Sequence, residues 1–363
     1  MSENKTTSQR LHWTLIAPIV AWLLFAGHYM VSSLFYSILS FLALIVSVLA
    51  AVHHAEVVAH RVGEPFGTLL LAIAVTIIEV GLIISLMLTP GHESPALARD
   101  TVFATEMIII TCIVGMCLLI GGLKYGEQTF SLDGVSAALT VLSAISVFTL
   151  ILPNYTQSAP GPFYNNKQLF FVAIVSLILY GTFLLVQTIR HRNYFLQQEE
   201  ETDEKTHSAV PTNKATAISI VFLMVSLAVV VLLAESLAPG IEAGIDKLGT
   251  PKSMVGVVIA MIVLLPEGIS ALQATRGNRL QSSLNLALGS ALASIGLSIP
   301  AVAFVAIYKG LPLTLGLDMK STVLYMLSLF ILLLSLRTGR TTILQGVILL
   351  IVFAVYIFIT IVP

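Results

Sequence analysis

Charged side chains are scarce in this sequence. Only 10% of the 363 residues are Asp, Glu, Lys or Arg, whereas 57% are hydrophobic. A soluble domain has about a quarter of its residues charged, so this chain lacks the polar side chains needed to cover a water-soluble surface of its size. The composition therefore predicts an integral membrane protein in contact with the lipid bilayer, and it leaves no stretch for a second, soluble domain.

The sequence has only two cysteines and no nucleotide-binding motif. The two cysteines, Cys112 and Cys117, lie in one apolar segment on different helical faces, which favours a packing role over a disulfide or a metal site. The chain has no Gly-rich phosphate loop, and its aromatic residues show no pattern typical of nucleic-acid binding. We therefore expect no cofactor, no nucleotide or nucleic-acid partner, and no ATP-driven mechanism.

Long apolar runs dominate the chain instead. A membrane-spanning helix needs roughly 20 apolar residues, and about eleven segments meet this requirement. The predicted fold is therefore an all-α polytopic membrane protein. The expected spans are residues 12–29, 33–60, 66–89, 100–121, 134–153, 167–190, 216–236, 254–274, 282–308, 321–337 and 341–361.

The basic residues predict the orientation of these spans. With the N-terminus inside, twelve Lys and Arg residues fall in cytoplasmic segments and six on the opposite side. Cytoplasmic loops of membrane proteins carry the excess of Lys and Arg. We therefore expect a cytoplasmic N-terminus, which is retained because no signal-peptide cleavage site follows it.

One polar stretch, at residues 193–214, divides the chain nearly in half. It contains a short acidic run, and the stretch is either a solvated linker or a loop that concentrates cations. When the first span is set aside, five spans precede this stretch and five follow it, as expected for two repeats of opposite topology. The predicted parts are a tail, an extra first helix, the first repeat, the acidic linker and the second repeat, at residues 1–11, 12–32, 33–192, 193–214 and 215–363.

Two spans carry a carboxylate near their centres. Glu79 lies in the stretch 63–85 and Glu267 in the stretch 249–273, and both stretches begin with Gly-x-Pro. Each glutamate is about 20 Å from the entry end of its helix, at 1.5 Å per residue. Ionisable groups at membrane depth are costly and indicate functional sites. The pair predicts one midplane site where Glu79 and Glu267 bind metal cations and protons in turn; neutral, hydrogen-bonded packing residues are the alternative.

Neutral oxygen atoms near these glutamates could complete such a site. Pro266, directly before Glu267, removes one helical hydrogen bond and frees backbone carbonyls close to that carboxylate. Hard cations bind oxygen ligands of this kind. Hydroxyl side chains also join membrane helices to one another, which is the alternative role. The candidate supporting ligands are Thr76, Ser290, Ser294 and Asn285.

A second group of titratable residues lies near the ends of other spans. His53, Glu56 and His60 share one helical face of the second span, and Glu235 ends the seventh. Because histidine titrates near neutral pH, these residues predict a proton relay or a pH sensor, with an interfacial polar cluster as the alternative. Their spacing differs from the His-Glu-x-x-His arrangement of a zinc peptidase. Glu106, in the fourth span, either lines an outer vestibule or extends towards the outer surface.

Three segments carry a family resemblance. GEPFG at residues 63–67, GGLKYGEQTF at 121–130 and LPEG at 265–268 resemble the calcium:cation antiporter superfamily, in its calcium/proton exchanger branch. The chain is most similar to the bacterial ChaA-type sodium (potassium, calcium)/proton antiporters, and the likeness covers essentially its whole length. The resemblance implies a bacterial inner-membrane protein with eleven spans in two inverted five-helix repeats.

The same resemblance implies which residues bind the ions. The third and eighth spans of the family carry the cation- and proton-binding glutamates, which match Glu79 and Glu267. The residues before them, 75–76 and 263–264, depart from the Gly-Asn pattern of the wider family. Fewer amide oxygens favour sodium or potassium as substrates beside calcium.

These observations predict a secondary active antiporter rather than an enzyme. We expect it to export calcium, and sodium or potassium, in exchange for protons by alternating access at the two-glutamate site. A cation channel or uniporter that uses the same carboxylates is the alternative. A membrane metal hydrolase would need the zinc motif that the histidine spacing does not supply.

Overall fold

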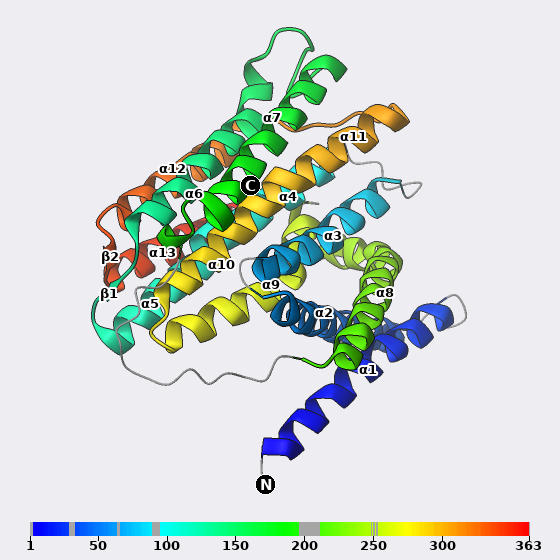
Figure 1. The fold of residues 1–363 in the computed structure, drawn as a ribbon. Helices are drawn as coiled ribbons and strands as arrows, with labels where there is room; N and C mark the ends of the chain where they lie inside the picture. The colour runs from blue at the N-terminus through cyan, green and yellow to red at the C-terminus, as the bar shows by residue number, and fades with distance from the viewer. Residues whose placement is uncertain are drawn as a thin grey trace. The chain divides into compact units, whose positions relative to one another are not determined.

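The structure is a computed structural model that describes residues 3–28, 33–63, 66–88, 95–195, 211–247, 249, 251 and 253–362. Helices form almost all of this part of the chain (Figure 1). Nine of them are long and apolar enough to cross a membrane, and two shorter apolar segments, Trp13–Gly27 and Ile73–Leu88, bring the total to eleven in the described residues. The prediction of an all-α polytopic membrane protein is confirmed.

The helices form two compact units. Unit 1 combines Met1–Pro90 with Thr202–Leu248, and unit 2 combines Gly91–Glu201 with Gly249–Pro363. Each unit therefore takes helices from both halves of the sequence. The helices of unit 1 are α1 (Glu3–Gly27), α2 (Leu34–Val62), α3 (Phe66–Leu88) and α8 (Asn213–Lys247).

Unit 2 holds the remaining helices and one small β-ribbon. Its α-helices are α4 (Leu97–Met107), α5 (Val114–Tyr125), α6 (Leu132–Ser146), α7 (Asn166–Leu185), α9 (Ser253–Arg276), α10 (Leu280–Ala293), α11 (Ile299–Lys309), α12 (Met319–Leu336) and α13 (Ile343–Ile361). Its π-helical segments are η1 (Ile108–Ile113), η2 (Val147–Ile151), η4 (Val186–Arg190) and η6 (Ser294–Ser298), and its short 3₁₀ turns are η3 (Leu152–Tyr155) and η5 (Arg192–Tyr194). The strands β1 (Gln128–Thr129) and β2 (Arg340–Thr341) pair antiparallel.

Unit 1 is organised around α2, which contacts α1, α3 and α8. The helix starts at an N-cap, where the Ser33 side chain accepts a hydrogen bond from the Tyr36 amide, and it ends at Gly63. Gly63 has φ = 80°, a left-handed value that glycine adopts without steric cost. The buried face of α2 carries small residues, such as Ala51 and Ala55, which allow close helix packing.

Two long spans of unit 2 are interrupted by π-helical turns. Segments α4, η1 and α5 form one span from Leu97 to Tyr125, and α10, η6 and α11 form another from Leu280 to Lys309. A π-helical turn pairs each amide with the carbonyl five residues earlier and is frequent at functional sites. The two interruptions lie in the predicted fourth and ninth spans, which the repeat prediction treats as equivalent.

Helix α9 runs beside the first of these spans in the same direction. A Cβ built on Gly256 would lie 3.1 Å from the backbone C atom of Asp100, and one built on Gly268 would lie 3.6 Å from Cδ1 of Ile113. These two contacts are 12 residues apart on α9 and 13 apart on the neighbouring span. Glu267 is therefore level with the end of η1.

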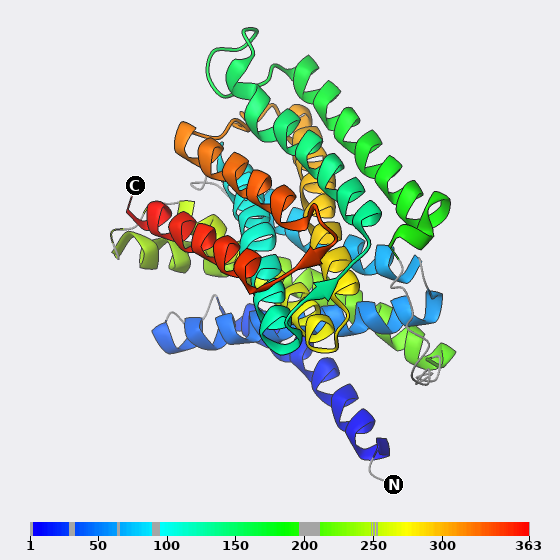
Figure 2. The same cartoon turned by 90° about the vertical axis from the view of Figure 1, so that its left-hand side faces the viewer.

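Helices α5 and α13 cross with their backbones almost touching. A Cβ on Gly346 would lie 2.4 Å from the backbone N of Leu119 and 2.8 Å from the carbonyl O of Gly115, so a side chain has no room there. The β-ribbon, with Gln128 opposite Thr341, lies at the start of α13 (Figure 2). Small residues thus fix the approach of two helices, as is common in membranes.

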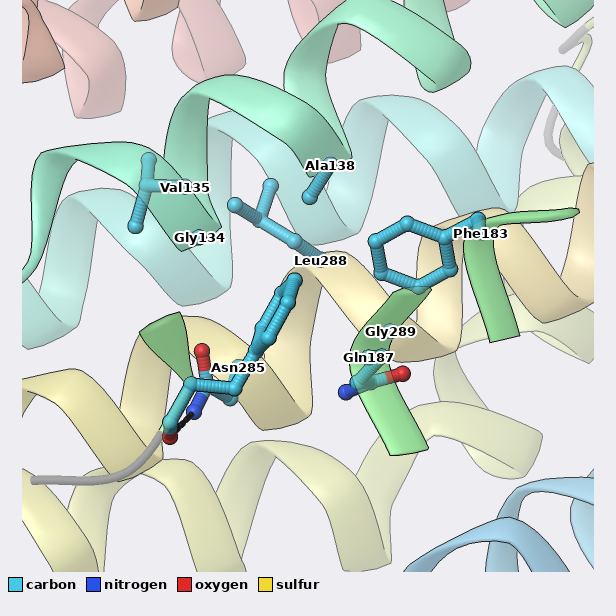
Figure 3. A pocket seen from close by; sticks show the side chains of 9 residues that line it. Gly134, Val135, Ala138, Phe183, Gln187, Asn285, Leu288 and Gly289 are labelled. Atoms are coloured by element: carbon cyan, nitrogen blue, oxygen red, sulfur yellow. Dashed lines mark hydrogen bonds between the residues drawn. The ribbon is translucent and has the colours of Figure 1, made fainter. Parts of the chain in front are cut away.

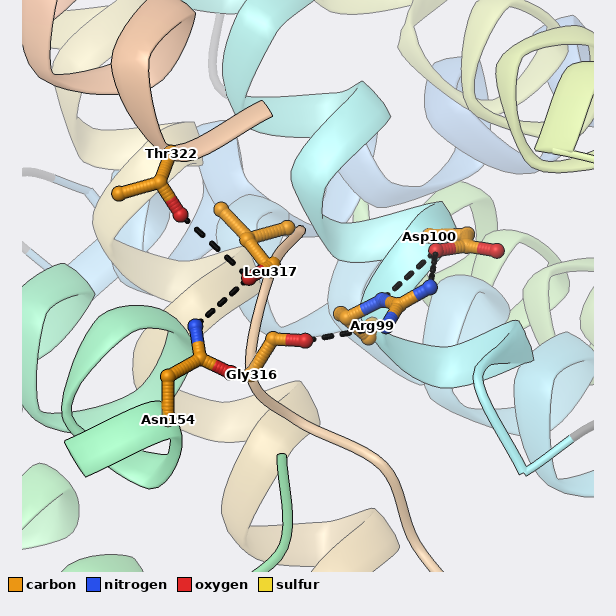
Figure 4. Close-up of polar contacts among 6 residues, drawn as sticks. All are labelled: Arg99, Asp100, Asn154, Gly316, Leu317 and Thr322. Atoms are coloured by element: carbon orange, nitrogen blue, oxygen red, sulfur yellow. Dashed lines mark hydrogen bonds and ion pairs between the residues drawn. The ribbon is translucent and has the colours of Figure 1, made fainter. Parts of the chain in front are cut away.

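Polar contacts fasten one end of unit 2 (Figure 4). Arg99 pairs with Asp100, with Nη2 2.7 Å from Oδ1, and donates a hydrogen bond to the Gly316 carbonyl at 3.0 Å. Asn154 donates to the Leu317 carbonyl at 2.6 Å. The start of α4 and the 3₁₀ turn η3 are therefore both hydrogen-bonded to the segment before α12. We refer to this end as the Asp100 end.

Candidate cation and proton site

Glu79 lies in the buried part of α3 in unit 1. Its side chain is 4% exposed and that of Thr76, one turn earlier, is 5% exposed. Ile77, on another face of the same helix, is 51% exposed. Because a three-residue spacing places side chains on one helical face, Thr76 and Glu79 together form a buried polar face of α3.

A second carboxylate of unit 1 is tied to α3 by a hydroxyl. Ser85 donates a hydrogen bond of 2.5 Å to Oε2 of Glu235, which joins α3 to α8. Pro239 lies inside α8, four residues after Glu235, and therefore leaves the Glu235 carbonyl without its helical amide donor. The predicted relay residue Glu235 is thus a half-buried polar contact between two helices.

The predicted histidine face of α2 is largely exposed in unit 1. Glu56 and His60 are exposed and His53 is half-buried, so the helices of unit 1 do not cover this face. His54, which the spacing argument passed over, is 0% exposed. Its Nε2 lies 3.3 Å from the Thr14 carbonyl on α1 and its Nδ1 lies 3.2 Å from Oγ of Ser219 on α8. The buried imidazole of this region is therefore His54.

A proline explains why His54 bonds to Thr14. Pro18 lies inside α1 and has no amide hydrogen, so the carbonyl four residues earlier, that of Thr14, loses its helical donor. A carbonyl can only accept, which places the hydrogen of the neutral imidazole on Nε2 and makes Nδ1 the acceptor for the Ser219 hydroxyl. One side chain thus joins α1, α2 and α8. Pro18 was the sequence signal that could have identified the pair.

Glu267 lies in the buried part of α9 in unit 2. Its side chain is 7% exposed on α9, which contacts α4, α5, α10 and η1. Pro266 lies inside α9, as predicted, so the carbonyl of Ile262 loses its helical amide partner. A backbone oxygen without a helical donor therefore lies about one turn from this buried carboxylate.

The hydroxyl candidates of unit 2 fall on or beside η6. Ser294 is the first residue of η6 and is 3% exposed, whereas Ser290, one turn earlier on α10, is half-buried. Ser298, at the other end of η6, is 0% exposed. The Ser294 and Ser298 hydroxyls therefore lie where the regular α-helical hydrogen-bond pattern is broken, which is frequent at functional sites.

Asn285 has structural partners instead. Its amide donates to the Phe195 carbonyl at 2.6 Å, and its side-chain oxygen accepts from Gln281 at 2.8 Å. The indentation next to it, among α6, α7 and α10, is lined by apolar side chains such as Leu288 and Phe183 and is too narrow to admit water (Figure 3). The amide atoms of Asn285 hold the chain at Phe195 against α10, so the cation-ligand prediction gains no support from this geometry.

Glu106 is fully buried on α4, at 0% exposure. The expectation that its side chain extends to the outer surface is therefore wrong. The Tyr325 hydroxyl of α12 donates to its Oε2 at 3.4 Å, which holds the carboxyl group inside unit 2.

Within the described residues, no group of three or more His, Cys, Asp or Glu side chains could hold a metal ion. Both cysteines are free thiols, and Cys117 accepts a hydrogen bond from Ser283 at 3.0 Å. The structure therefore offers carboxylate, hydroxyl and carbonyl oxygens as ligands, which suit hard cations such as calcium and sodium.

The sequence profile of the family described as "Sodium/calcium exchanger protein" matches residues 32–189 and 218–362. The chain belongs to this sodium/calcium exchanger family. It is 44% identical over 317 residues to the "Putative ionic transporter y4hA" of Sinorhizobium fredii, covering 87% of this chain and 86% of that protein. It is 34% identical over 323 residues to the "Sodium-potassium/proton antiporter ChaA" of Escherichia coli, covering 88% and 87% of the two chains.

The fold agrees with this assignment. The structure entitled "Crystal Structure of H+/Ca2+ Exchanger CAX" matches with a TM-score of 0.73 at 16% identity, over 98% of this chain and 88% of that one. The resemblance inferred from GEPFG and LPEG is confirmed. As a member of the sodium/calcium exchanger family, the chain is an integral membrane transport protein and not an enzyme.

Proposed function

We propose that this exchanger-family protein is a secondary active cation/proton antiporter that moves calcium, with sodium or potassium as further substrates, against protons. The observation that carries the proposal is a buried carboxylate in each compact unit, Glu79 on α3 and Glu267 on α9. The names of the relatives support it, since one is a sodium-potassium/proton antiporter and another, from Schizosaccharomyces pombe, is a vacuolar calcium ion transporter.

The physical basis of exchange is the cost of an empty, charged site. A buried carboxylate without a partner costs several kcal/mol, so it is stable only when it is protonated or bound to a cation. A pair of such groups that shares one site can hold a metal cation or protons but resists being empty. Glu79 and Glu267 would alternate between these two loaded states, with Thr76, Ser290 and Ser294 as neutral ligands.

Alternating access would follow from the two repeats. The family profile matches residues 32–189 and 218–362 separately, which supports an internal duplication with divisions near those predicted. Both the fourth and the ninth span contain a π-helical turn between two α-helices, whereas the π-helical turns η2 and η4 follow the only α-helix of their spans. This shared interruption supports the equivalence of the fourth and ninth spans. Opposite shifts of equivalent helices would expose the shared site to one side of the membrane and then to the other.

We also propose that the protein resides in a bacterial inner membrane with its N-terminus in the cytoplasm. The excess of Lys and Arg in the segments on that side supports this orientation. Thiol labelling from outside the cell of a single cysteine introduced at Lys320 tests it. In a chain otherwise free of cysteine, labelling is expected at position 320 and not at Arg192.

The function is tested in sealed vesicles that contain the purified protein and a pH-sensitive dye. Addition of calcium, sodium or potassium to the outside should drive protons out of the vesicle, whereas a channel or uniporter would carry the cation without obligatory proton movement. Glu79→Gln and Glu267→Gln should each abolish the coupled flux, because an amide cannot release a proton or offer a negative charge. Glu127→Gln, at an exposed ion pair with Arg340, is the matched control and should retain exchange.

Two results would contradict the proposal. Full exchange in both Glu79→Gln and Glu267→Gln would refute the two-glutamate site. Cation flux that continues in native protein without any proton flux, at zero membrane potential, would favour the channel or uniporter.

A further inference from the structure

Glu106 is the third fully or nearly fully buried glutamate among the described residues of the membrane spans, and the proposed exchange cycle does not use it. It belongs to α4 and is 0% exposed. A carboxyl group at this depth is costly to keep, and buried ionisable groups of transporters commonly mark ion or proton pathways. Its surroundings in unit 2 show which ligand it could hold.

Two hydroxyl groups form a chain that ends at Glu106. The Tyr325 hydroxyl on α12 donates to Oε2 of Glu106 at 3.4 Å, and Oγ of Ser146 on α6 lies 2.7 Å from the same Tyr325 hydroxyl. Both Tyr325 and Ser146 are 0% exposed. When Ser146 donates to Tyr325, the tyrosine hydroxyl becomes a better donor to the carboxylate, because hydrogen bonds in a chain polarise one another. The arrangement can therefore stabilise an ionised Glu106.

Aromatic rings pack around Tyr325 at one end of this hydroxyl chain. The Phe103 ring packs edge-on against Tyr325, with centroids 5.7 Å apart, and against Tyr356 of α13, with centroids 5.5 Å apart. The hydroxyls of Tyr325 and Ser146 are hydrogen-bond donors, which stabilise the carboxylate form of Glu106 directly or through one another. A proton needs only one carboxyl oxygen. A carboxyl group held in this way can take up and release a proton.

Glu106 lies between the Asp100 end of unit 2 and Glu267. It is six residues beyond Asp100, about 9 Å along the helix at 1.5 Å per residue. Glu267 is level with Ile113, which is seven residues beyond Glu106, or about 10 Å further in. Glu106 is thus the buried carboxyl that a proton entering from the Asp100 end would meet first.

We propose that Glu106 is a further proton-exchanging carboxyl group of this antiporter, loaded and unloaded from the Asp100 end. The proposal rests on the proposed proton coupling of the chain. In the unloading step the carboxylic acid O–H bond breaks, its proton passes to a water molecule to give hydronium, and the electron pair stays on Glu106 as the carboxylate. The Tyr325 and Ser146 hydroxyls keep their protons and hold the anion. Reloading is the reverse transfer.

Other ionisable groups face the elements that surround Glu106 and enter any pH measurement. On its own span, Asp100 pairs with Arg99, and Cys112 and Cys117 follow further along. The elements packed against α4 and η1 carry Glu267 and Arg276 on α9, Tyr308 and Lys309 on α11, Tyr325 on α12 and Tyr356 on α13. Glu267 and Asp100 are the carboxyl groups whose titration could be mistaken for that of Glu106. The test removes Glu267, and the loss of a band with Glu106→Gln separates Glu106 from Asp100.

Infrared difference spectroscopy tests the proposal without relying on transport. In the double variant Glu79→Gln and Glu267→Gln, a protonated carboxyl C=O band should remain and should disappear as the pH is raised. Adding Glu106→Gln should remove that band. A band that is unchanged by the third substitution, or one that never titrates, would overturn the proposal, since it would belong to another group or to a permanently neutral packing residue.

Vesicle measurements give a second, independent readout in the chain with both midplane glutamates intact. Glu106→Gln should retain exchange but carry one proton fewer per cation, measured from the proton gradient that balances a fixed cation gradient. Tyr325→Phe should keep the native number of protons per cation and shift the pH profile of exchange to higher pH, because the Glu106 carboxylate loses its hydrogen-bond donor. A purely structural role predicts a native proton number and pH profile in both variants, with only a lower melting temperature, and that result would refute the assignment. If native protein shows no cation/proton exchange while the infrared band of Glu106 titrates as expected, the result would instead count against the proposed function.

Discussion

The contact between His54 and Thr14 gives a prediction that can be worked out from the fold. Substituting His54 by leucine removes the donor to the Thr14 carbonyl and the acceptor of the Ser219 hydroxyl. The Ser219 hydroxyl can turn to the carbonyl one turn earlier in its own helix, as serines in helices often do, so its loss costs little. The Thr14 carbonyl lacks the amide donor of a regular helix, because Pro18 supplies no amide hydrogen.

The expected cost is therefore that of the hydrogen bond from His54 to a buried carbonyl whose helical donor is missing. Removing the donor to a buried acceptor costs about 1–3 kcal/mol, so His54→Leu should lower the free energy of unfolding by about 2 kcal/mol. Pro18→Ala restores the helical amide donor for Thr14. In that background the same His54→Leu change should cost about 1 kcal/mol less than in the native chain, since the carbonyl then has its own donor.

The assay is reversible unfolding in mixed detergent micelles, applied to the native chain, the two single variants and the double variant. The four free energies form a double-mutant cycle, whose coupling term isolates the Pro18–His54 relationship. Additive effects, within about 0.5 kcal/mol, would refute the reasoning, because they would mean that the carbonyl freed by the proline is not what His54 stabilises.

Two further predictions concern unit 2. Gly346→Ala should lower the melting temperature of the protein markedly, because the new Cβ would lie 2.4 Å from the backbone nitrogen of Leu119. Gly181→Ala is the control: a Cβ there has nothing within 4 Å, so this variant should be neutral or stabilising in the same thermal assay. Equal melting temperatures of the two variants would contradict the close helix crossing. Asn285→Leu should lower the melting temperature, because the Phe195 carbonyl loses its donor, and leave the apparent affinity for the transported cation unchanged in the vesicle assay. A several-fold weaker cation affinity at native stability would instead restore Asn285 as a ligand.

Much of the fold could be predicted from the sequence because spans are long apolar runs. The second span, expected at residues 33–60, is α2 at Leu34–Val62, and the fifth, expected at 134–153, extends as helical turns from Leu132 to Tyr155. The requirement that every backbone group be bonded within the membrane makes such runs helical. The π-helical turns had no sequence signal, since they depend on packing against neighbouring helices.

The buried face of a membrane helix is harder to predict than its length. On α2 the exposed side chains include Phe35 and Leu42, whereas the buried ones include Ser47 and Ala51. Hydrophobicity therefore does not mark the interior, because lipid accepts large apolar residues and helix contacts favour small ones. The spacing of titratable residues likewise does not mark the interior: it selected His53, whereas the structure buries its neighbour, His54.

Contacts between segments far apart in the chain could not be predicted from the sequence either. The hydrogen bond between Tyr325 and Glu106 joins residues 219 apart in the chain, and the one between Ser85 and Glu235 joins residues 150 apart. A single sequence carries the residue types of such pairs but not their approach. Glu79 and Glu267 could be singled out because the cost of a carboxylate in a bilayer is local, a property of each span by itself.

The π-helical turn in the span Leu97–Tyr125 determines how this segment can change its length. Each residue of an α-helix turns the chain by about 100°, so one residue more in a regular helix would rotate everything after it by this angle. A π-turn absorbs the extra residue in a wider turn instead. Deleting one residue within Ile108–Ile113 would therefore close the wide turn to an α-turn and leave Gly115 against α13, whereas the same deletion in α4 or α5 would rotate the rest of the span. The span thus has one turn at which it can lose a residue without changing the helix contacts on either side.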